Sequence, residues 1–124
     1  MRRRWALLEA DLGHPLGHEQ GFLRPVLVIS NEAFNQASGL LTVLPATSLK
    51  PDRRPHPFEV FLPAGAAGNP LDSILLPHQI RTIAAHRIHR LCGRLTDRQL
   101  RHEVAEKVLR HVEFLDLLGL DEEP

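Results

Sequence analysis

The sequence predicts a small, mainly β protein, in which a twisted antiparallel sheet or half-open barrel packs against one amphipathic C-terminal helix. Three observations indicate this fold class. Short runs of β-branched and apolar residues alternate with turns rich in Gly and Pro along most of the chain. Apolar residues at helical spacing occur near the C-terminal end. The 124 residues, finally, fit a single domain over residues 1–124 that is long enough to bury a core.

Two strands are expected at the beginning of the chain. Residues 5–12 are mostly apolar and precede a run of turn-forming residues, so they are expected to form the first strand. Residues 13–21 hold three glycines and one proline, which predicts a flexible loop. Residues 26–29 include three β-branched residues and are expected to form a central, buried strand. Pro25 has no amide hydrogen and suits the first position of this strand.

The middle of the chain is expected to contain a helical turn, a third strand and a long loop. Asn31 is expected to cap the helical turn, which continues through Asn35. Residues 39–44 are rich in Leu, Thr and Val and predict the third strand, which Pro45 is expected to end. Residues 50–57 contain three prolines, four charged residues and one histidine without periodicity, which predicts an exposed, mobile loop.

Short strands are expected to continue after this loop. Strand character returns at residues 58–62, and residues 63–70 predict a turn because they contain Gly, Asn and Pro. Residues 73–76 and 80–83 are expected to form one or two further strands. This number of short strands with tight turns between them favours a curved antiparallel sheet.

The last element is expected to be a helix. Thr96, followed three residues later by Gln99, matches a capping box at its start. The apolar residues that follow recur on one helical face: Leu100, Val104, Val108, Val112 and Leu115. Gly119 is expected to end the helix, because glycine readily adopts the left-handed conformation found after a helix C-terminus.

Charge and cysteine content limit the classes of function. Lys+Arg and Asp+Glu each number 15, so the formal charge is zero, unlike that of a general nucleic-acid binder. Basic residues are nevertheless clustered at 2–4, 50–54 and 81–110, which is compatible with a local basic groove. The single cysteine, Cys92, excludes an internal disulfide and is typical of a reducing compartment, so a cytoplasmic location is expected. Acidic residues interrupt the apolar start, and no segment reaches membrane-spanning length.

Several short blocks follow one another along the chain in a distinctive order. They are Gly-His-Glu-Gln at 17–20, Arg-Pro-Val-Leu-Val-Ile-Ser at 24–30, Val-Leu-Pro-Ala-Thr-Ser at 43–48, Pro-Phe-Glu-Val at 57–60 and Gln-Ile-Arg-Thr-Ile at 79–83. In content, order and spacing the blocks resemble the MazF/PemK toxin family, from about residue 5 to the end of the C-terminal helix. The fold of that family, the half-open, SH3-like barrel shared by MazF and CcdB, agrees with the strand count given above.

The resemblance implies the toxin of a toxin–antitoxin system, which cleaves mRNA and thereby inhibits translation and growth. Members of the family are homodimeric, sequence-specific endoribonucleases that act on single-stranded RNA without a metal or other cofactor. They commonly leave a 2′,3′-cyclic phosphate and a 5′-hydroxyl. The expected partners are therefore single-stranded RNA, a second copy of the chain and a MazE-like antitoxin with an acidic tail, and no membrane.

The resemblance assigns the chemistry to two residues, Arg24 before the proline of the second strand and Thr47 after the proline of the third. Cleavage without a metal requires removal of a proton from the 2′-hydroxyl, stabilisation of a dianionic phosphorane, and protonation of the departing 5′-oxygen. A guanidinium is permanently charged and donates paired hydrogen bonds, so Arg24 suits stabilisation and not proton removal. Thr47 can donate one more hydrogen bond. His18 is the expected titrating group, because imidazole titrates near physiological pH and some relatives carry histidine in this loop.

Other residues are expected to bind substrate or to support the site: Glu19, Gln20, Ser48, His78, Gln79 and Arg81. Glu19, Gln20 and Gln79 could equally fix loops through hydrogen bonds to the backbone. Relatives often have an acidic residue just before the glutamine, where this chain has His78. Either His78 handles protons here, or other groups share that role, or the activity is reduced.

Two further features have ordinary structural interpretations. His86, His89 and Cys92 recur at steps of three, which on a helix would place three metal ligands along one side. Because a fourth ligand is missing and arginines are interleaved, no metal site is expected. Trp5 is expected to pack in the core or against a second subunit, in preference to stacking on RNA bases.

Two alternative functions remain open from the sequence. CcdB-like toxins share the fold but inhibit DNA gyrase by binding it and do not cut RNA; the blocks that contain Arg24 and Thr47 argue against this class. A family member with weakened catalysis that acts by binding RNA is the second alternative, and His78 favours it. The RNA sequence that is cut and the identity of the antitoxin cannot be read from one chain.

Overall fold

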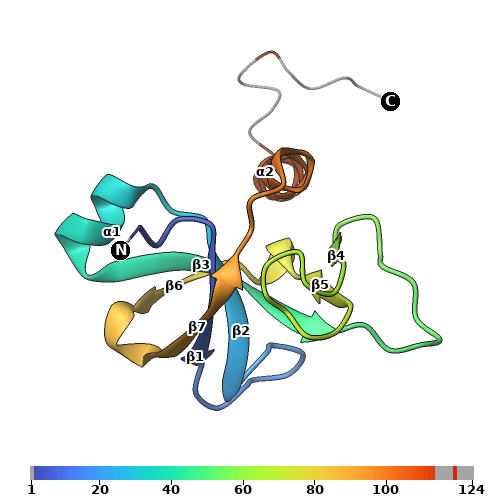
Figure 1. The fold of residues 1–124 in the computed structure, drawn as a ribbon, viewed down its shortest axis with the longest axis horizontal. Helices are drawn as coiled ribbons and strands as arrows, with labels where there is room; N and C mark the ends of the chain where they lie inside the picture. The colour runs from blue at the N-terminus through green and yellow to red at the C-terminus, as the bar shows by residue number, and fades with distance from the viewer. Residues whose placement is uncertain (1, 114–118, 120–124) are drawn as a thin grey trace.

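The computed structural model describes residues 2–113 and Gly119 (Figure 1). One antiparallel sheet contains all the strands: β1 (Ala6–Asp11), β2 (Leu23–Val28), β3 (Leu40–Ser48), β4 (Val60–Leu62), β5 (Ser73–Leu75), β6 (Arg81–Ala84) and β7 (Ile88–Arg94). The helices are α1 (Glu32–Ser38) and α2 (Arg98–Val112), with the short 3-10 helices η1 (Pro77–Gln79) and η2 (Ala85–Arg87). This architecture confirms the predicted fold class.

The strand order in the sheet is β4-β5-β3-β2-β1-β7, and β6 pairs with β3 beside this path. The long strand β3 connects the two parts of the sheet. Its first half pairs with β6 and β2, and its last residues, Ala46 to Ser48, pair with β5. Figure 1 shows the result: α1 and β6 lie on one side of β1, β2 and β7, and β4 and β5 lie on the other. The sheet is therefore strongly bent and does not close.

Both faces of the central strands are buried. Alternate side chains of β1 and β2 enter two different apolar clusters, because successive side chains of a strand point to opposite faces. Leu7 and Leu27 belong to the first cluster, which α2 covers through Val104. Leu8 and Val26 belong to the second, which β3 and β6 complete. Burial of one such side chain contributes about 1.5–3 kcal/mol, so the two clusters fix the sheet that carries the polar residues described below.

Pro25 and Pro45 lie inside their strands and not at the strand ends where they were predicted. β2 begins at Leu23, so Pro25 lies inside the strand, opposite Glu9 of β1. β3 does not end at Pro45 but continues to Ser48. Pro45 lies where the pairing of β3 passes from β2 to β5, and proline is accepted at such a bend because no ladder hydrogen bond needs its missing amide hydrogen. The helical turn capped by Asn31 is also longer than predicted and reaches Ser38.

The strand β7 was not predicted, and the last helix has other ends than those expected. β7 is rich in charged residues, which hides its strand character, and it pairs with β1 at the edge of the sheet. Asp97, not Thr96, caps α2, because its carboxylate accepts a hydrogen bond from the Leu100 amide at 2.9 Å. The helix ends at Val112, before Gly119, with Glu113 in the left-handed conformation (φ 57°). Leu115 lies outside the described residues.

Trp5 packs against the first cluster, as predicted for a core residue. The guanidinium groups of Arg4 and Arg101 lie 5.4 and 5.1 Å from its ring centroid, so both take part in cation–π contacts. Arg101 also donates from Nε to the Leu95 carbonyl at 2.8 Å, which ties α2 to the end of β7. In the part of the chain that is described, no helix has the length and apolarity needed to cross a membrane.

Candidate active site

Three hollows share lining residues along the bent sheet and are here together called the central groove. The first hollow contains Arg24 and lies over the ends of β2 and β3; the second shares Thr47 and Ser48 with it and extends towards η1. The third hollow shares three residues with the second: Gln20, in the loop before β2, and His78 and Gln79, on η1. All nine residues predicted for the site line this groove: Arg24, Thr47, His18, Glu19, Gln20, Ser48, His78, Gln79 and Arg81. The fold thus brings together segments that are far apart in the sequence.

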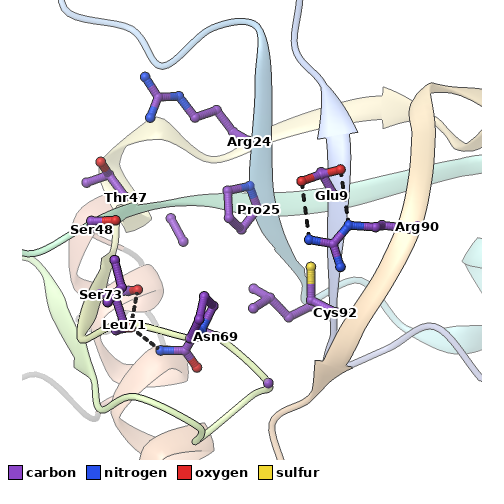
Figure 2. A pocket seen from close by; sticks show the side chains of 14 residues that line it. Glu9, Arg24, Pro25, Thr47, Ser48, Asn69, Leu71, Ser73, Arg90 and Cys92 are labelled. Carbon is purple, nitrogen blue, oxygen red and sulfur yellow. Dashed lines mark hydrogen bonds and ion pairs between the residues drawn. The ribbon is translucent and has the colours of Figure 1, made fainter.

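Arg24 is the second residue of β2 and is half-buried in the first hollow. Its Nε donates to the carbonyl of Gly21 at 3.2 Å, and within residues 2–113 no other hydrogen bond or ion pair holds its side chain. Figure 2 shows the guanidinium on the same side of the strand as Thr47, away from the Glu9–Arg90 pair. Both terminal nitrogens are therefore available to an anionic ligand.

Thr47 and Ser48 lie at the end of β3, opposite Ile74 and Ser73 of β5. Neither hydroxyl hydrogen-bonds to any group among the described residues, so neither is used in a turn of the backbone. Both residues line the first and the second hollow, and Figure 2 shows Thr47 on the side of the sheet to which the Arg24 guanidinium points. Because successive side chains of a strand point to opposite faces, Ser48 does not share this side. The arrangement of one guanidinium and one free hydroxyl suits a phosphate group.

The far wall of the first hollow is held by its own hydrogen bonds. The buried side chain of Asn69 donates to the carbonyls of Leu62 and Leu71 and accepts from the Ala67 amide (Figure 2). Gly68 lies directly against β7, where a Cβ atom would be 2.3 Å from the Cys92 carbonyl oxygen. The residue therefore has to be glycine, and its φ of +86° requires the same. These contacts make the wall a rigid boundary of the hollow.

Gln79 holds the loop of residues 13–21 against η1. Its Nε2 donates to the carbonyl of His18 at 3.1 Å, and its Oε1 accepts from the Gln20 amide at 2.7 Å. Glu19 accepts a hydrogen bond from the Leu16 amide at 3.1 Å. Of the two interpretations left open for Gln79 and Glu19, the structure therefore shows the loop-fixing contacts. They leave the His18 side chain exposed at the rim of the second hollow.

Arg81, in β6, is used in a similar way. Its Nη1 donates to the carbonyl of Leu12 at 3.3 Å and so connects β6 to the end of β1. It also lines the third hollow. Its hydrogen bond shows a structural contribution, and a role in substrate binding stays a prediction.

His78 lies on η1 between the second and third hollows. Its Nδ1 is buried and has no hydrogen-bond partner among the described residues. Burial lowers the pKa of His78 below its ordinary value; the negative charge of Glu59 opposes this shift, and the positive charges of His111, His56 and Arg53 add to it. The neutral imidazole is therefore the favoured form near neutral pH.

The pKa of His78 predicts a pH dependence of stability. The unfolded chain, with a histidine pKa near 6.5, takes up this proton more readily than the folded protein. Stability is therefore expected to fall as the pH drops from 6.5 towards the lowered pKa, and to be fully retained above 6.5. The melting temperature of wild type, measured between about pH 7.5 and about pH 5.5, should fall more than that of His78→Gln.

The exposed His102 on α2 provides the matched control, because His102→Gln removes an imidazole elsewhere. Its melting temperature should follow that of wild type across the pH range. Equal slopes for wild type and His78→Gln would show that the burial of His78 has no energetic consequence.

The three residues at metal-like spacing do not share one side of a helix. His86 lies on η2, and His89 and Cys92 lie on the strand β7, where residues three apart point to opposite faces. Among residues 2–113 and Gly119, no group of three or more His, Cys, Asp and Glu side chains is arranged to hold a metal ion. Burial raises the pKa of the Cys92 thiol, which lines the first hollow in its neutral form.

Residues 3–112 match the family model of the PemK-like, MazF-like toxins of type II toxin–antitoxin systems. The chain belongs to the PemK/MazF toxin family. Endoribonuclease MazF9 of Mycobacterium tuberculosis, a curated relative, is 34% identical over 105 residues, which cover 81% of this chain and 87% of MazF9. The similarity thus extends over nearly all of both chains.

Solved structures of the PemK/MazF family have the same fold. A crystal structure of MazF from Deinococcus radiodurans has a TM-score of 0.72 and 28% identity, and the match covers 89% of this chain and 94% of that chain. A crystal structure of MazE-MazF from the same organism has a TM-score of 0.63 and 29% identity, with 94% and 95% covered. The bent, unclosed sheet is therefore the fold of the family.

Two groups in the central groove of this PemK/MazF protein were not predicted as site residues. Phe58 lines the second hollow between the rings of His56 and His78. Glu9 and Arg90 form an ion pair with a shortest distance of 3.3 Å in the first hollow. Phe58 lies in one of the family-like blocks and could have been found there, whereas the pairing of Glu9 with Arg90 depends on the unpredicted strand β7.

Proposed function

We propose that this chain is the toxin of a type II toxin–antitoxin pair and acts as a sequence-specific endoribonuclease on single-stranded RNA, with mRNA as its cellular substrate. The observation that carries the proposal is the Arg24 guanidinium, whose terminal nitrogens have no partner among the described residues and which lies on the same side of the strand as Thr47, whose hydroxyl is also free there. The family to which the chain belongs, and the endoribonuclease MazF9 among its relatives, support the same assignment.

The proposed reaction is an internal transfer of the phosphodiester. The 2′-oxygen bonds to the adjacent phosphorus, the bond from phosphorus to the 5′-oxygen breaks, and the products are a 2′,3′-cyclic phosphate and a 5′-hydroxyl. Arg24 stabilises the dianionic phosphorane through its terminal nitrogens, and the Thr47 hydroxyl donates one further hydrogen bond to a phosphate oxygen. The proton lost by the 2′-hydroxyl goes to a base, and an acid supplies one to the 5′-oxygen. These steps need no metal ion.

His18 is the proposed proton carrier. Its side chain is exposed and lines the second hollow, as Thr47 does, and its loop is positioned by Gln79. If His18 exchanges protons with the RNA, the pH profile of kcat/KM should contain a limb that is present in the wild type and absent in His18→Ala. A pH profile measured by fluorogenic RNA cleavage tests the role.

His14 belongs to the same loop and contacts the ring of Phe22, so His14→Ala is the matched control and should keep the limb. If the limb persists in His18→Ala but disappears in His78→Gln, the proton passes through His78. A limb that persists in both variants removes both histidines from proton transfer.

A homodimer in the cytoplasm, restrained by a MazE-like antitoxin, completes the proposal. Large apolar side chains are exposed at the start of β2 and on the edge strand β7, at Leu23 and Leu91, and are available for contact with a second copy. Two copies related by a two-fold axis would extend the groove along both sets of loops. The acidic tail of an antitoxin would compete with RNA for the Arg24 site, because both are anionic and flexible. The single cysteine agrees with a reducing compartment.

The test of the proposed function is incubation of a long RNA of mixed sequence with the purified protein in the presence of excess chelator. Cuts are expected at a short recurring sequence, and each fragment downstream of a cut should carry a 5′-hydroxyl that a polynucleotide kinase can phosphorylate directly. Arg24→Ala, purified in parallel, controls for contaminating nucleases. Intact RNA together with inhibition of DNA gyrase would replace the proposal by the CcdB-like function, and binding without cleavage would favour the weakened family member.

A further inference from the structure

We propose that Phe58, together with His56 and His78, forms a stacking platform for a nucleobase beside the phosphate that is cleaved. The inference rests on the proposed endoribonuclease function, since it concerns the RNA that occupies the same groove. It assigns a binding role to a side chain, Phe58, that differs from all the residues predicted for the site.

The three rings form one ordered group in the second hollow. The rings of His56 and Phe58 are nearly parallel, with an interplanar angle of 14° and centroids 5.2 Å apart. The ring of His78 meets Phe58 edge to face, at 82° and 4.8 Å. In spite of these two neighbours, Phe58 remains 48% exposed. Part of the Phe58 ring is therefore open to the second hollow and accessible to a ligand there.

Hydrogen bonds on both sides hold the platform in place. Glu59, the next residue along the chain, is 4% exposed and accepts from the backbone amide of His56 at 2.8 Å and from Arg53 Nη2 at 2.7 Å. Lys107 of α2 donates a hydrogen bond to the carbonyl of Pro57. The backbone that carries His56 and Phe58 is thus held before a ligand binds, so binding loses less conformational entropy than it would with a free loop.

The position of the platform fits a nucleotide that is bound at Arg24. Thr47, which lies on the same side of the sheet as the Arg24 guanidinium, lines the second hollow together with the three rings, so the proposed base contact adjoins the proposed phosphate contact. The hollow measures about 710 Å³, within the roughly 300–1,000 Å³ typical of small-ligand sites. Lys50 and Arg53 line it as well and place positive charge near the path of the RNA backbone.

The chemistry favours a nucleobase over other ligands. Proteins bind single-stranded RNA by stacking its unpaired bases on aromatic side chains, with basic side chains along the backbone. The other candidate for such stacking, Trp5, has Arg4 and Arg101 beside its ring and packs against the core. Because every base has an aromatic face, the platform contributes affinity and position and does not by itself select the base.

The experiment uses a short 2′-O-methyl RNA, which lacks the attacking hydroxyl and stays intact, with 2-aminopurine placed at one position at a time. With the wild-type protein, fluorescence should be quenched at the position that stacks on Phe58. Phe58→Leu keeps an apolar side chain but removes the aromatic face; it should abolish this quenching and raise the Kd about tenfold. Phe58→Tyr should preserve both, and melting curves of both variants show whether they fold.

Phe34 on α1 is the matched control, because it is similarly exposed (39%) but is absent from the three hollows of the central groove. Phe34→Leu should leave the quenching and the Kd unchanged. A folded Phe58→Leu protein with wild-type quenching and Kd would overturn the platform.

Cleavage of the unmodified RNA, measured in parallel, separates the two proposals. If wild type cleaves RNA but Phe58→Leu changes neither KM nor quenching, the stacking platform is wrong and the nuclease assignment stands. If wild type binds with quenching that depends on Phe58 but does not cleave, the platform stands and the nuclease assignment is wrong. If wild-type protein neither binds nor cleaves RNA, both proposals are wrong.

Discussion

Replacement of Arg24 by alanine is expected to lower the rate of RNA cleavage by about 10³-fold or more, with little change in stability. The terminal nitrogens of this guanidinium have no partner among the described residues, so its loss leaves the developing phosphorane charge without its main stabilisation. The folded protein loses only the hydrogen bond from Nε to the Gly21 carbonyl, a cost of about 0.5–1.5 kcal/mol. Single-turnover cleavage with excess protein measures the chemical step directly.

Two further substitutions complete this experiment. Arg24→Lys keeps the charge but cannot donate paired hydrogen bonds, so it should recover only part of the lost rate. Arg98→Ala removes an exposed arginine at the start of α2, outside the groove, and should cleave RNA like wild type. Full activity of Arg24→Ala would disprove the assignment of electrostatic stabilisation to this residue.

Thr47→Val is expected to reduce the single-turnover rate by about 10²-fold. Valine has nearly the shape of threonine and suits the strand β3, so the change removes a hydrogen-bond donor and leaves the pairing of β3 with β5 intact. Since the Thr47 hydroxyl has no partner among the described residues, its removal leaves no protein group unpaired. The loss should therefore appear in the rate of cleavage and not in the melting temperature.

Ser48 provides the comparison for Thr47, because it lines the same two hollows and its hydroxyl is also free among the described residues. Ser48→Ala is expected to have a smaller effect, consistent with a role in binding. If Ser48→Ala were more damaging than Thr47→Val, the donor to the phosphorane would be Ser48.

The strands in the two apolar clusters could be predicted because their side chains obey simple patterns. β1 and the β-branched part of β2 are apolar on both faces and were recognised for that reason. β7 escaped prediction, since an edge strand that is exposed on one side carries arginines and histidine, which resemble a loop. The continuation of β3 past Pro45 depends on its change of partner, which no local pattern contains.

The residues predicted for the site lie in neighbouring hollows, but the contacts that they make could not be predicted. Through its resemblance to the family, the sequence pointed to residues in four separate segments, and all of them line the groove. The hydrogen bonds of Gln79 to the loop, and of Arg81 to Leu12, join residues about sixty or more positions apart, which no periodicity encodes. The exposure of Phe58 likewise results from the packing of its neighbours and is visible only in three dimensions.

The amide of Gln79 has a consequence for the motion of the groove. Its two hydrogen bonds to the loop are worth about 0.5–1.5 kcal/mol each, far less than the apolar clusters that hold the sheet. The rim that carries His18 is therefore expected to detach and return many times while the sheet stays folded. Amide hydrogen exchange at Gln20 should consequently be faster than in the centre of β2. The same opening of the loop would let RNA enter the groove from the side without unfolding of the sheet.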